Sequence, residues 1–170
     1  MRVPCLARWP GRVPAGRTCA ELATTMDLLP TFARLAGGEP PEDRTIDGHD
    51  IRPLLFGHPG AASPYDAFFY YDVDQLQAVR AGRWKLYLPL AAKRGRGRKV
   101  PASGPGLLYD LVADVAEARN VADAHPDVVA RLTAFADRAR RDLGDGPARG
   151  AGQRPPGHEP NPTPRTLPPT

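Results

Sequence analysis

The stretch that most constrains the fold is Leu76–Leu90, whose sequence reads LQAVRAGRWKLYLPL. Apolar and polar side chains alternate along its second half, in the order Trp84, Lys85, Leu86, Tyr87 and Leu88. A period of two is typical of a strand that buries one of its faces. Ala81-Gly82 separates the two halves, and glycine supplies the positive φ of a tight hairpin turn. The stretch therefore predicts a β-hairpin.

An isolated hairpin is only marginally stable in water, so these two strands need partners. Two short runs can supply them, AFFYY at Ala67–Tyr71 and LLYDL at Leu107–Leu111. Over Pro126–Leu143, apolar residues recur at three- and four-residue steps, which indicates an amphipathic helix. We predict an α+β unit in which an antiparallel sheet of about four strands packs against this helix.

The N-terminal third differs from this unit. Arg2–Pro10 is a short apolar segment that suits a strand buried on both faces of a parallel sheet. Such a strand needs neighbours and crossover helices, so part of the fold is expected to lie outside this chain. Asp27 and Asp50 each stand three residues before a proline, with apolar residues and a glycine following. We expect both to cap a short helix.

Proline and glycine are abundant, with 21 and 17 residues, and this favours long irregular segments. Gly146–Thr170 holds eight of the prolines and no aromatic residue, so it is expected to be a disordered tail. No apolar run reaches the roughly 18–20 residues of a membrane span, and the first residues lack the apolar core of a signal peptide. As written, the chain is expected to remain cytoplasmic.

Six groups of landmark residues follow one another along the chain: Arg2–Pro4 with Arg8–Gly11, Thr25–Thr31 with Leu35–Gly37, Asp47–Asp50 with Pro53–Leu55, Ala78–Arg80 with Gly82–Lys85, Leu108–Leu111 with Asp114 and Glu117, and Asn120–Ala122. In this order they resemble the C-terminal part of the sulfatase family, of the arylsulfatase type, over roughly residues 2–145. No single group is specific, but the shared order is.

The resemblance implies an alkaline-phosphatase-like parent fold, with a large α/β domain and a smaller C-terminal domain that has a four-stranded antiparallel sheet and a helix. Residues 1–60 would then be the last strand and helices of the large domain. Residues 61–145 would be the C-terminal subdomain, and residues 146–170 the tail.

The resemblance also implies hydrolysis of sulfate esters by a formylglycine, made from the first residue of a Cys/Ser-x-Pro/Ala-x-Arg motif. A divalent cation, usually Ca²⁺, would be held by Asp and Asn oxygens. The family places these residues upstream of Arg2-Val3-Pro4, and neither Cys5 nor Cys19 begins such a motif. We therefore expect no catalytic residue, no metal ligand and no bound cofactor here, and no activity from this chain alone.

For the full-length enzyme, the implied partner is a sulfated small molecule or glycan, and export is left open. A missing N-terminal half is a further candidate partner of this chain. No membrane partner is expected.

The net charge of +4 is local, because one segment carries five positive charges: Lys93, Arg94, Arg96, Arg98 and Lys99. It is either a solvated, disordered loop or a loop at the mouth of the substrate cleft that attracts a sulfated substrate. A third interpretation is nucleic-acid binding through phosphates, but no aromatic residue interleaves the cations to stack on bases. The alternative function is accordingly a small non-enzymatic module that binds a polyanion through residues 93–99.

Two groups of side chains invite a metal-site interpretation: His49 with Asp47 and Asp50, and Asp110 with Asp114 and Glu117. We favour turn and helix-cap roles for the first group and solvated turn positions for the second. Arg80 and Lys85 are expected to be charges on a strand face.

Overall fold

The computed structural model describes residues 3–90, 93–95, 98–100 and 104–155, and in the 93–100 region it describes the backbone only. The chain divides into two compact units, Met1–Asp66 and Ala67–Thr170.

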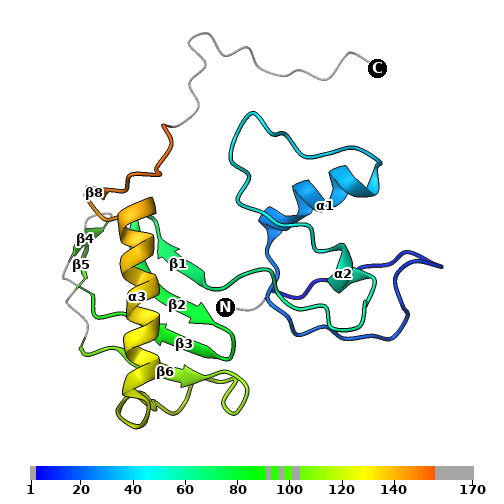
Figure 1. The fold of residues 1–170 in the computed structure, drawn as a ribbon. Coiled ribbons are helices and arrows are strands. Elements are labelled where there is room, and N and C mark those ends of the chain that lie inside the picture. Colours follow the sequence, from blue (N-terminus) through cyan, green and yellow to red (C-terminus); the bar gives the residue numbers. More distant parts are fainter. Residues whose placement is uncertain (1–2, 91–92, 96–97, 101–103, 156–170) are drawn as a thin grey trace. The chain divides into compact units, whose positions relative to one another are not determined.

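The second unit contains an antiparallel sheet with one helix across it (Figure 1). Its strands are β1 (Phe68–Asp72), β2 (Gln75–Ala81), β3 (Trp84–Tyr87) and β6 (Leu107–Asp110), in the order β1-β2-β3-β6. Helix α3 (Pro126–Leu143) begins with a proline in its first turn and ends at Gly144. The α+β architecture predicted from the sequence is confirmed, including both ends of the helix.

The turn between β2 and β3 lies one residue later than expected. Ala81 pairs with Trp84, so the two turn residues are Gly82 and Arg83 rather than Ala81 and Gly82. Gly82 has φ +55°, and Arg83 is not among the non-glycine residues with positive φ. A positive φ at the first central position alone matches a type II′ turn, which suits the right-handed twist of hairpin strands.

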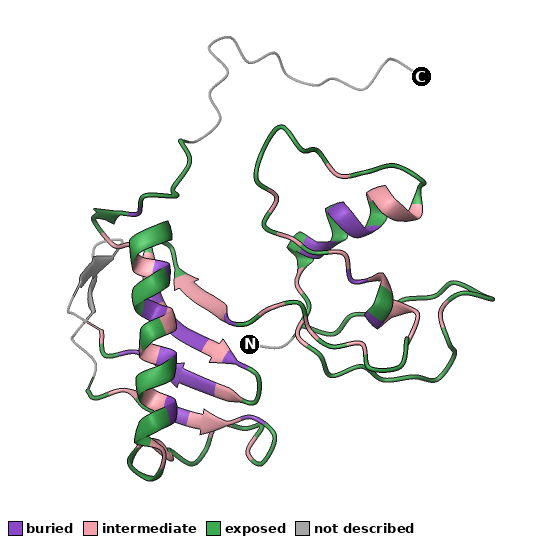
Figure 2. Ribbon diagram, in the orientation of Figure 1, coloured by how far each residue is buried: buried purple, intermediate pink, exposed green. Residues whose placement is uncertain are grey.

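The core of this unit lies between the sheet and α3. Val79, Leu86 and Leu108 come from three neighbouring strands and are at most 2% exposed. Leu132 and Ala136, four residues apart on α3, are fully buried against them. Figure 2 shows this buried layer along β2, β3 and the inner side of α3. Side chains at a spacing of four share one helix face, which explains why the periodicity predicted the helix correctly.

A short hairpin follows α3, where the tail was expected to begin. It is formed by β7 (Gly144–Asp145) and β8 (Ala148–Arg149). The Tyr71 hydroxyl donates to the Gly144 carbonyl at 2.8 Å, and the Leu76 amide donates to Asp145 Oδ1 at 2.9 Å. The expectation of disorder is corrected for residues 146–152, because the amides of Gly146, Ala151 and Gly152 donate to backbone carbonyls at 2.7–2.8 Å. Residues 156–170 lie outside the described residues.

The first unit contains a 3₁₀ turn at Thr25–Asp27, helix α1 (Leu28–Leu35) and helix α2 (Arg52–Leu55). The strand expected over Arg2–Pro10 is not formed at the described residues 3–10, where Val3 is 79% and Leu6 100% exposed. A strand exists only where a neighbour accepts and donates its backbone hydrogen bonds, and residues 3–10 have no such neighbour within this unit.

Candidate functional site

The carboxylate of Asp27 joins three segments of the first unit. It is completely buried and accepts hydrogen bonds from the Thr24 amide at 2.6 Å and the His49 amide at 2.8 Å. The Tyr65 hydroxyl also donates to it. Burial, and next the hydrogen bond to Asp27, raise the pKa of Tyr65 to about 12. The expected helix-cap role is therefore wrong for Asp27: Thr24 caps the 3₁₀ turn, and Asp27 forms the second half of its capping box.

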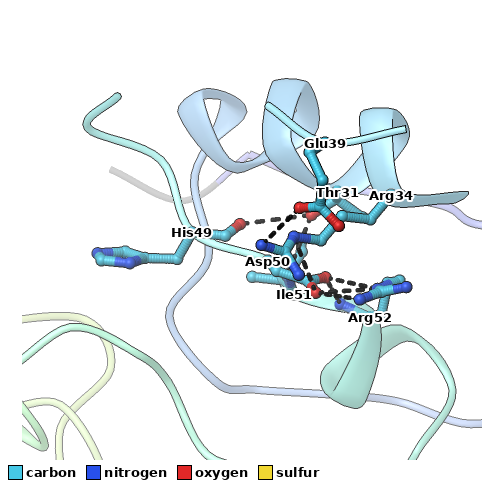
Figure 3. Close-up of polar contacts among 7 residues, drawn as sticks. All are labelled: Thr31, Arg34, Glu39, His49, Asp50, Ile51 and Arg52. Carbon is cyan, nitrogen blue, oxygen red and sulfur yellow. Dashed lines mark hydrogen bonds and ion pairs between the residues drawn. The ribbon is translucent and has the colours of Figure 1, made fainter. Parts of the chain in front are cut away.

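Asp50 lies one residue before the N-cap of α2, which is Ile51, so it is not the N-cap expected for it, although its carboxylate does bind the first amide of the helix (Figure 3). It accepts from the Arg52 amide at 3.0 Å, and Arg52 Nη2 lies 2.7 Å from its second oxygen. Burial alone would raise the pKa of Asp50, but the hydrogen bonds and charge of Arg52 outweigh burial and lower it. Arg34 lies 2.8 Å from Glu39 and 3.9 Å from Asp50, so the charges in this cluster are paired.

His49 does not join a metal cluster. Its ring meets Tyr65 edge to face at 4.8 Å between centroids, and in Figure 3 it points away from Asp50 and Arg52. Gly48 fixes the backbone beside it, since a Cβ there would lie 1.9 Å from the Met26 carbonyl oxygen. Among the residues that the structure describes, no three His, Cys, Asp or Glu side chains are grouped so as to hold a metal ion.

Lys85 is a buried charge on the sheet face opposite α3. It is 3% exposed, and its ammonium donates to Tyr87 Oη at 2.6 Å and to Glu117 at 2.8 and 3.1 Å. The rings of Tyr87 and Tyr70 lie 4.4 and 5.1 Å from Nζ. Burial would lower the pKa of Lys85, but the hydrogen bonds to Glu117 and Tyr87 outweigh it and raise that pKa. Lys85 is a strand-face charge, as expected, but alternation alone could not reveal that it is buried, because its partner Glu117 is 32 residues away.

Asp110 is the last residue of β6 and Asp114 lies in the turn after it, and both carboxylates accept backbone hydrogen bonds of that turn. Asp110 pairs with Arg83 and accepts from the Val112 amide at 3.1 Å, and Asp114 accepts from the Arg119 amide at 2.8 Å. Glu117 differs from these two aspartates, because its carboxylate accepts hydrogen bonds from the Lys85 side chain and not from the backbone of the turn. Its own backbone has φ +57°. Each carboxylate thus serves a different partner, and the three do not form a set of donors that fits Ca²⁺.

The predicted basic site forms a two-stranded ribbon between β3 and β6. Its strands are β4 (Lys93–Gly95) and β5 (Arg98–Val100), with Arg94 opposite Lys99. Arg96 lies outside the described residues. Strand pairing of residues 93–95 with 98–100 thus differs from the disordered loop that was one of the sequence interpretations.

The sheet positions the base of this ribbon. The last pair that joins β3 to β6 is Tyr87–Leu107, next to the points where residues 88–106 leave and re-enter the sheet. A Cβ at Gly106 would lie 3.1 Å from the Tyr87 carbonyl oxygen, so the two ends of the insertion approach each other closely.

A shallow cavity of about 280 Å³ lies beside the C-terminal hairpin and is lined by Tyr71, Val73, Leu143 and Asp145, among others. This is below the roughly 300–1,000 Å³ of typical ligand sites. The described residues contain no helix with the length and apolar composition needed to cross a membrane.

Comparison with known proteins identifies related sequences. Residues 63–154 match the family model described as the C-terminal region of aryl-sulfatase. The chain is 38% identical to human arylsulfatase D over 167 residues, covering 84% of this chain and 28% of that protein. It is 41% identical to mouse steryl-sulfatase over 138 residues, covering 70% and 22%. The chain thus spans less than a third of the length of these relatives.

Solved structures agree in fold. A sulfatase from Pseudoalteromonas, PsFucS1, superposes with a TM-score of 0.64 at 18% identity, over 82% of this chain and 30% of that one. A protein from a glycosaminoglycan-metabolising locus of Bacteroides thetaiotaomicron gives a TM-score of 0.51 at 27% identity, over 67% and 24%. These neighbours have the alkaline-phosphatase-like fold of sulfatases, and this chain matches a part of it.

Proposed function

The chain belongs to the aryl-sulfatase family, whose C-terminal region it carries, and from this premise we propose that it serves the hydrolysis of a sulfate ester. The observation that carries the proposal is the match over residues 63–154, which spans the whole sheet and α3. The relatives are named for sulfatase activity.

In this proposal the reacting groups belong to a catalytic portion that this chain does not contain. The family uses a formylglycine and Ca²⁺, but Cys5 and Cys19 lack the required motif and the carboxylates after β6 are committed to structural contacts. The described residues therefore do not fit the metal, and no step of the reaction is assigned to them. The chain alone is proposed to be inactive.

The first unit is proposed to pack against that catalytic portion, as the end of the large domain over residues 1–60. The packing of α1 supports this. Its buried positions are Pro30 and Thr31, whereas Leu29 is 54% and Phe32 57% exposed. A helix that exposes large apolar side chains such as Leu29 and Phe32 is suited to a covering partner.

The basic ribbon is proposed to lie at the mouth of the substrate cleft and to favour an anionic, sulfated substrate. Its five cations stand within seven residues of the sequence, between two strands of the rigid sheet: Lys93, Arg94, Arg96, Arg98 and Lys99. A loop positioned by a rigid scaffold is a common place for binding residues. The same ribbon would serve the alternative function, a non-enzymatic module that binds a polyanion.

A chimaera tests the main proposal. Replacing the C-terminal region of an active arylsulfatase by residues 1–155 of this chain is expected to retain turnover of an aryl sulfate with Ca²⁺ present. The purified 170-residue chain is expected to give none. Turnover by the isolated chain would refute its proposed inactivity, and a folded but inactive chimaera would favour the polyanion-binding alternative.

A further inference from the structure

We infer that Lys85, together with Glu117 and Tyr87, is a positioning cluster that fixes the base of the basic ribbon, so that anion binding by the ribbon depends on a buried lysine that never touches the ligand. The binding part of this inference rests on the proposed function of the ribbon. The positioning part rests on described residues alone.

The cluster lies at the end of β3, on the sheet face opposite the core. Lys85 and Tyr87 are two residues apart on β3 and therefore share a face, opposite the core residue Leu86. Tyr87 is the last residue of β3, and the insertion that contains the ribbon starts directly after it. Whatever fixes the Tyr87 side chain therefore acts at the point where the ribbon leaves the sheet.

The Lys85 ammonium holds Tyr87 in two ways. It donates to the hydroxyl at 2.6 Å and lies 4.4 Å from the centre of the ring. Tyr109, from β6, meets the same ring edge to face at 5.9 Å between centroids, so Tyr87 contacts the strand that follows the insertion. A cation over an aromatic ring is stabilising, more so when it is shielded from water as Lys85 is.

Glu117 keeps the ammonium in this position. It supplies the negative charge at 2.8 Å, from a loop whose backbone is held by Asp114 and Asn120. A non-glycine residue at φ +57° is strained, and such strain persists only where surrounding contacts determine it. The Lys85–Glu117 pair is that contact, and it connects residues 111–121 to the base of the ribbon.

The experiment compares two charge-matched variants of the full chain. Lys85→Met removes the buried ammonium but keeps the length of the side chain. Arg83→Met removes one positive charge at the other end of β3, from a side chain that is 48% exposed. Amide exchange is measured at Leu88 and Leu107, and heparin affinity is measured as a function of salt.

We expect Lys85→Met to raise exchange at Leu88 and Leu107 and to weaken heparin binding, each by at least about fivefold. Exchange in α3 should not change. The slope of log affinity against log salt should also stay constant, because Lys85 makes no contact with the ligand, whereas neutralising ribbon cations should reduce that slope. Arg83→Met should leave exchange at Leu88 and Leu107 unchanged.

Unchanged exchange at Leu88 and Leu107 in Lys85→Met would overturn the inference, as would a reduced salt slope. If Lys85→Met also loses protection in α3, the same exchange measurement is made on Glu117→Gln, which keeps the Lys85 ammonium and removes the negative charge that holds it. Unchanged exchange at Leu88 and Leu107 in that variant would then overturn the inference. Absence of heparin binding by the unaltered chain would refute the anion-binding function of the ribbon, while the exchange data would still decide the positioning role.

Discussion

At the scale of single residues, the most unusual feature of this protein is its buried charged side chains. Asp27 and Lys85 are almost inaccessible, yet in the described part of the chain no buried side-chain nitrogen or oxygen lacks a hydrogen-bond partner. Removing one member of such a pair leaves the other desolvated and unpaired, which costs more than the pair itself contributes. Substitutions at the partners of Asp27 and Lys85 are therefore the most informative.

Glu117→Gln is expected to lower the free energy of unfolding by about 1–3 kcal/mol at pH 7. Burial raises the pKa of Glu117, but hydrogen bonds from Lys85 and Tyr87 outweigh it and lower that pKa. A depressed folded-state pKa contributes stability above the unfolded value of about 4.3, and this stability is lost as the pH falls through the folded value. The difference between variant and unaltered protein should therefore shrink in acid.

Urea unfolding of both proteins between pH 7 and pH 3 measures this difference. Asp123→Asn, which removes an exposed carboxylate, serves as the control and should change stability little at either pH. A Glu117→Gln deficit of equal size at pH 3 would show that the charge of Glu117 is not what stabilises the pair.

Tyr65→Phe is expected to remove a tyrosine whose hydroxyl loses its proton only near pH 12. The raised pKa of about 12 means that the native state keeps the Tyr65 proton between about pH 10 and pH 12, where an unfolded tyrosine loses it. Stability from this group is thus complete below pH 10 and declines as the pH rises. The tyrosinate absorbance of unaltered protein minus variant gives the midpoint directly, and a value near 10 would contradict the contact with Asp27.

At the scale of elements, one helix and one sheet account for the core. All residues of the main buried apolar cluster lie between Ala67 and Ala139, and α3 supplies four of them: Val128, Leu132, Ala136 and Ala139. The C-terminal hairpin adds polar contacts, since Asp145 binds both the Leu76 amide and Arg140. The helix is consequently fixed along its length by apolar contact and at its end by hydrogen bonds.

Leu132→Ala is expected to cost about 2–5 kcal/mol of unfolding free energy, because Leu132 is fully buried and the cavity cannot be filled by solvent. Leu143→Ala, on the same helix, is the matched control and should cost much less, since Leu143 is 41% exposed. Thermal unfolding followed by the helical circular dichroism signal compares the two. Equal losses would mean that α3 does not pack as described.

At the scale of the molecule, the two units differ in how much they bury. Among the described residues of the first unit, the buried apolar ones are Pro30, Ile51 and Leu54, and its best-shielded groups include Asp27 and Thr31. The second unit has a continuous core of its own. Since apolar burial is the main stabilising term, the second unit should be the more stable one.

Residues 63–155 expressed alone are expected to fold with the same helical signal per residue as in the full chain. In the full chain, amides of residues 3–24 should exchange with little protection, and those of β2, β3 and α3 slowly. Strong protection of residues 3–24 in a monomer would contradict this. The comparison of fragment and full chain also shows how far the second unit depends on the first.

The sequence alone determined the sheet, the helix Pro126–Leu143 and the family resemblance, because each depends on local periodicity or on the order of short landmarks. Alternation around Trp84–Leu88 correctly predicted which side of β3 holds the core, and it could not tell that Lys85 on the other side was also buried. Tertiary structure alone decided that Lys85 meets Glu117, that Asp27 binds Tyr65, and that Gly144–Arg149 forms a hairpin. The physical reason is that such contacts depend on one or two side chains that meet only after folding. A contact of this kind leaves no periodic pattern in the sequence.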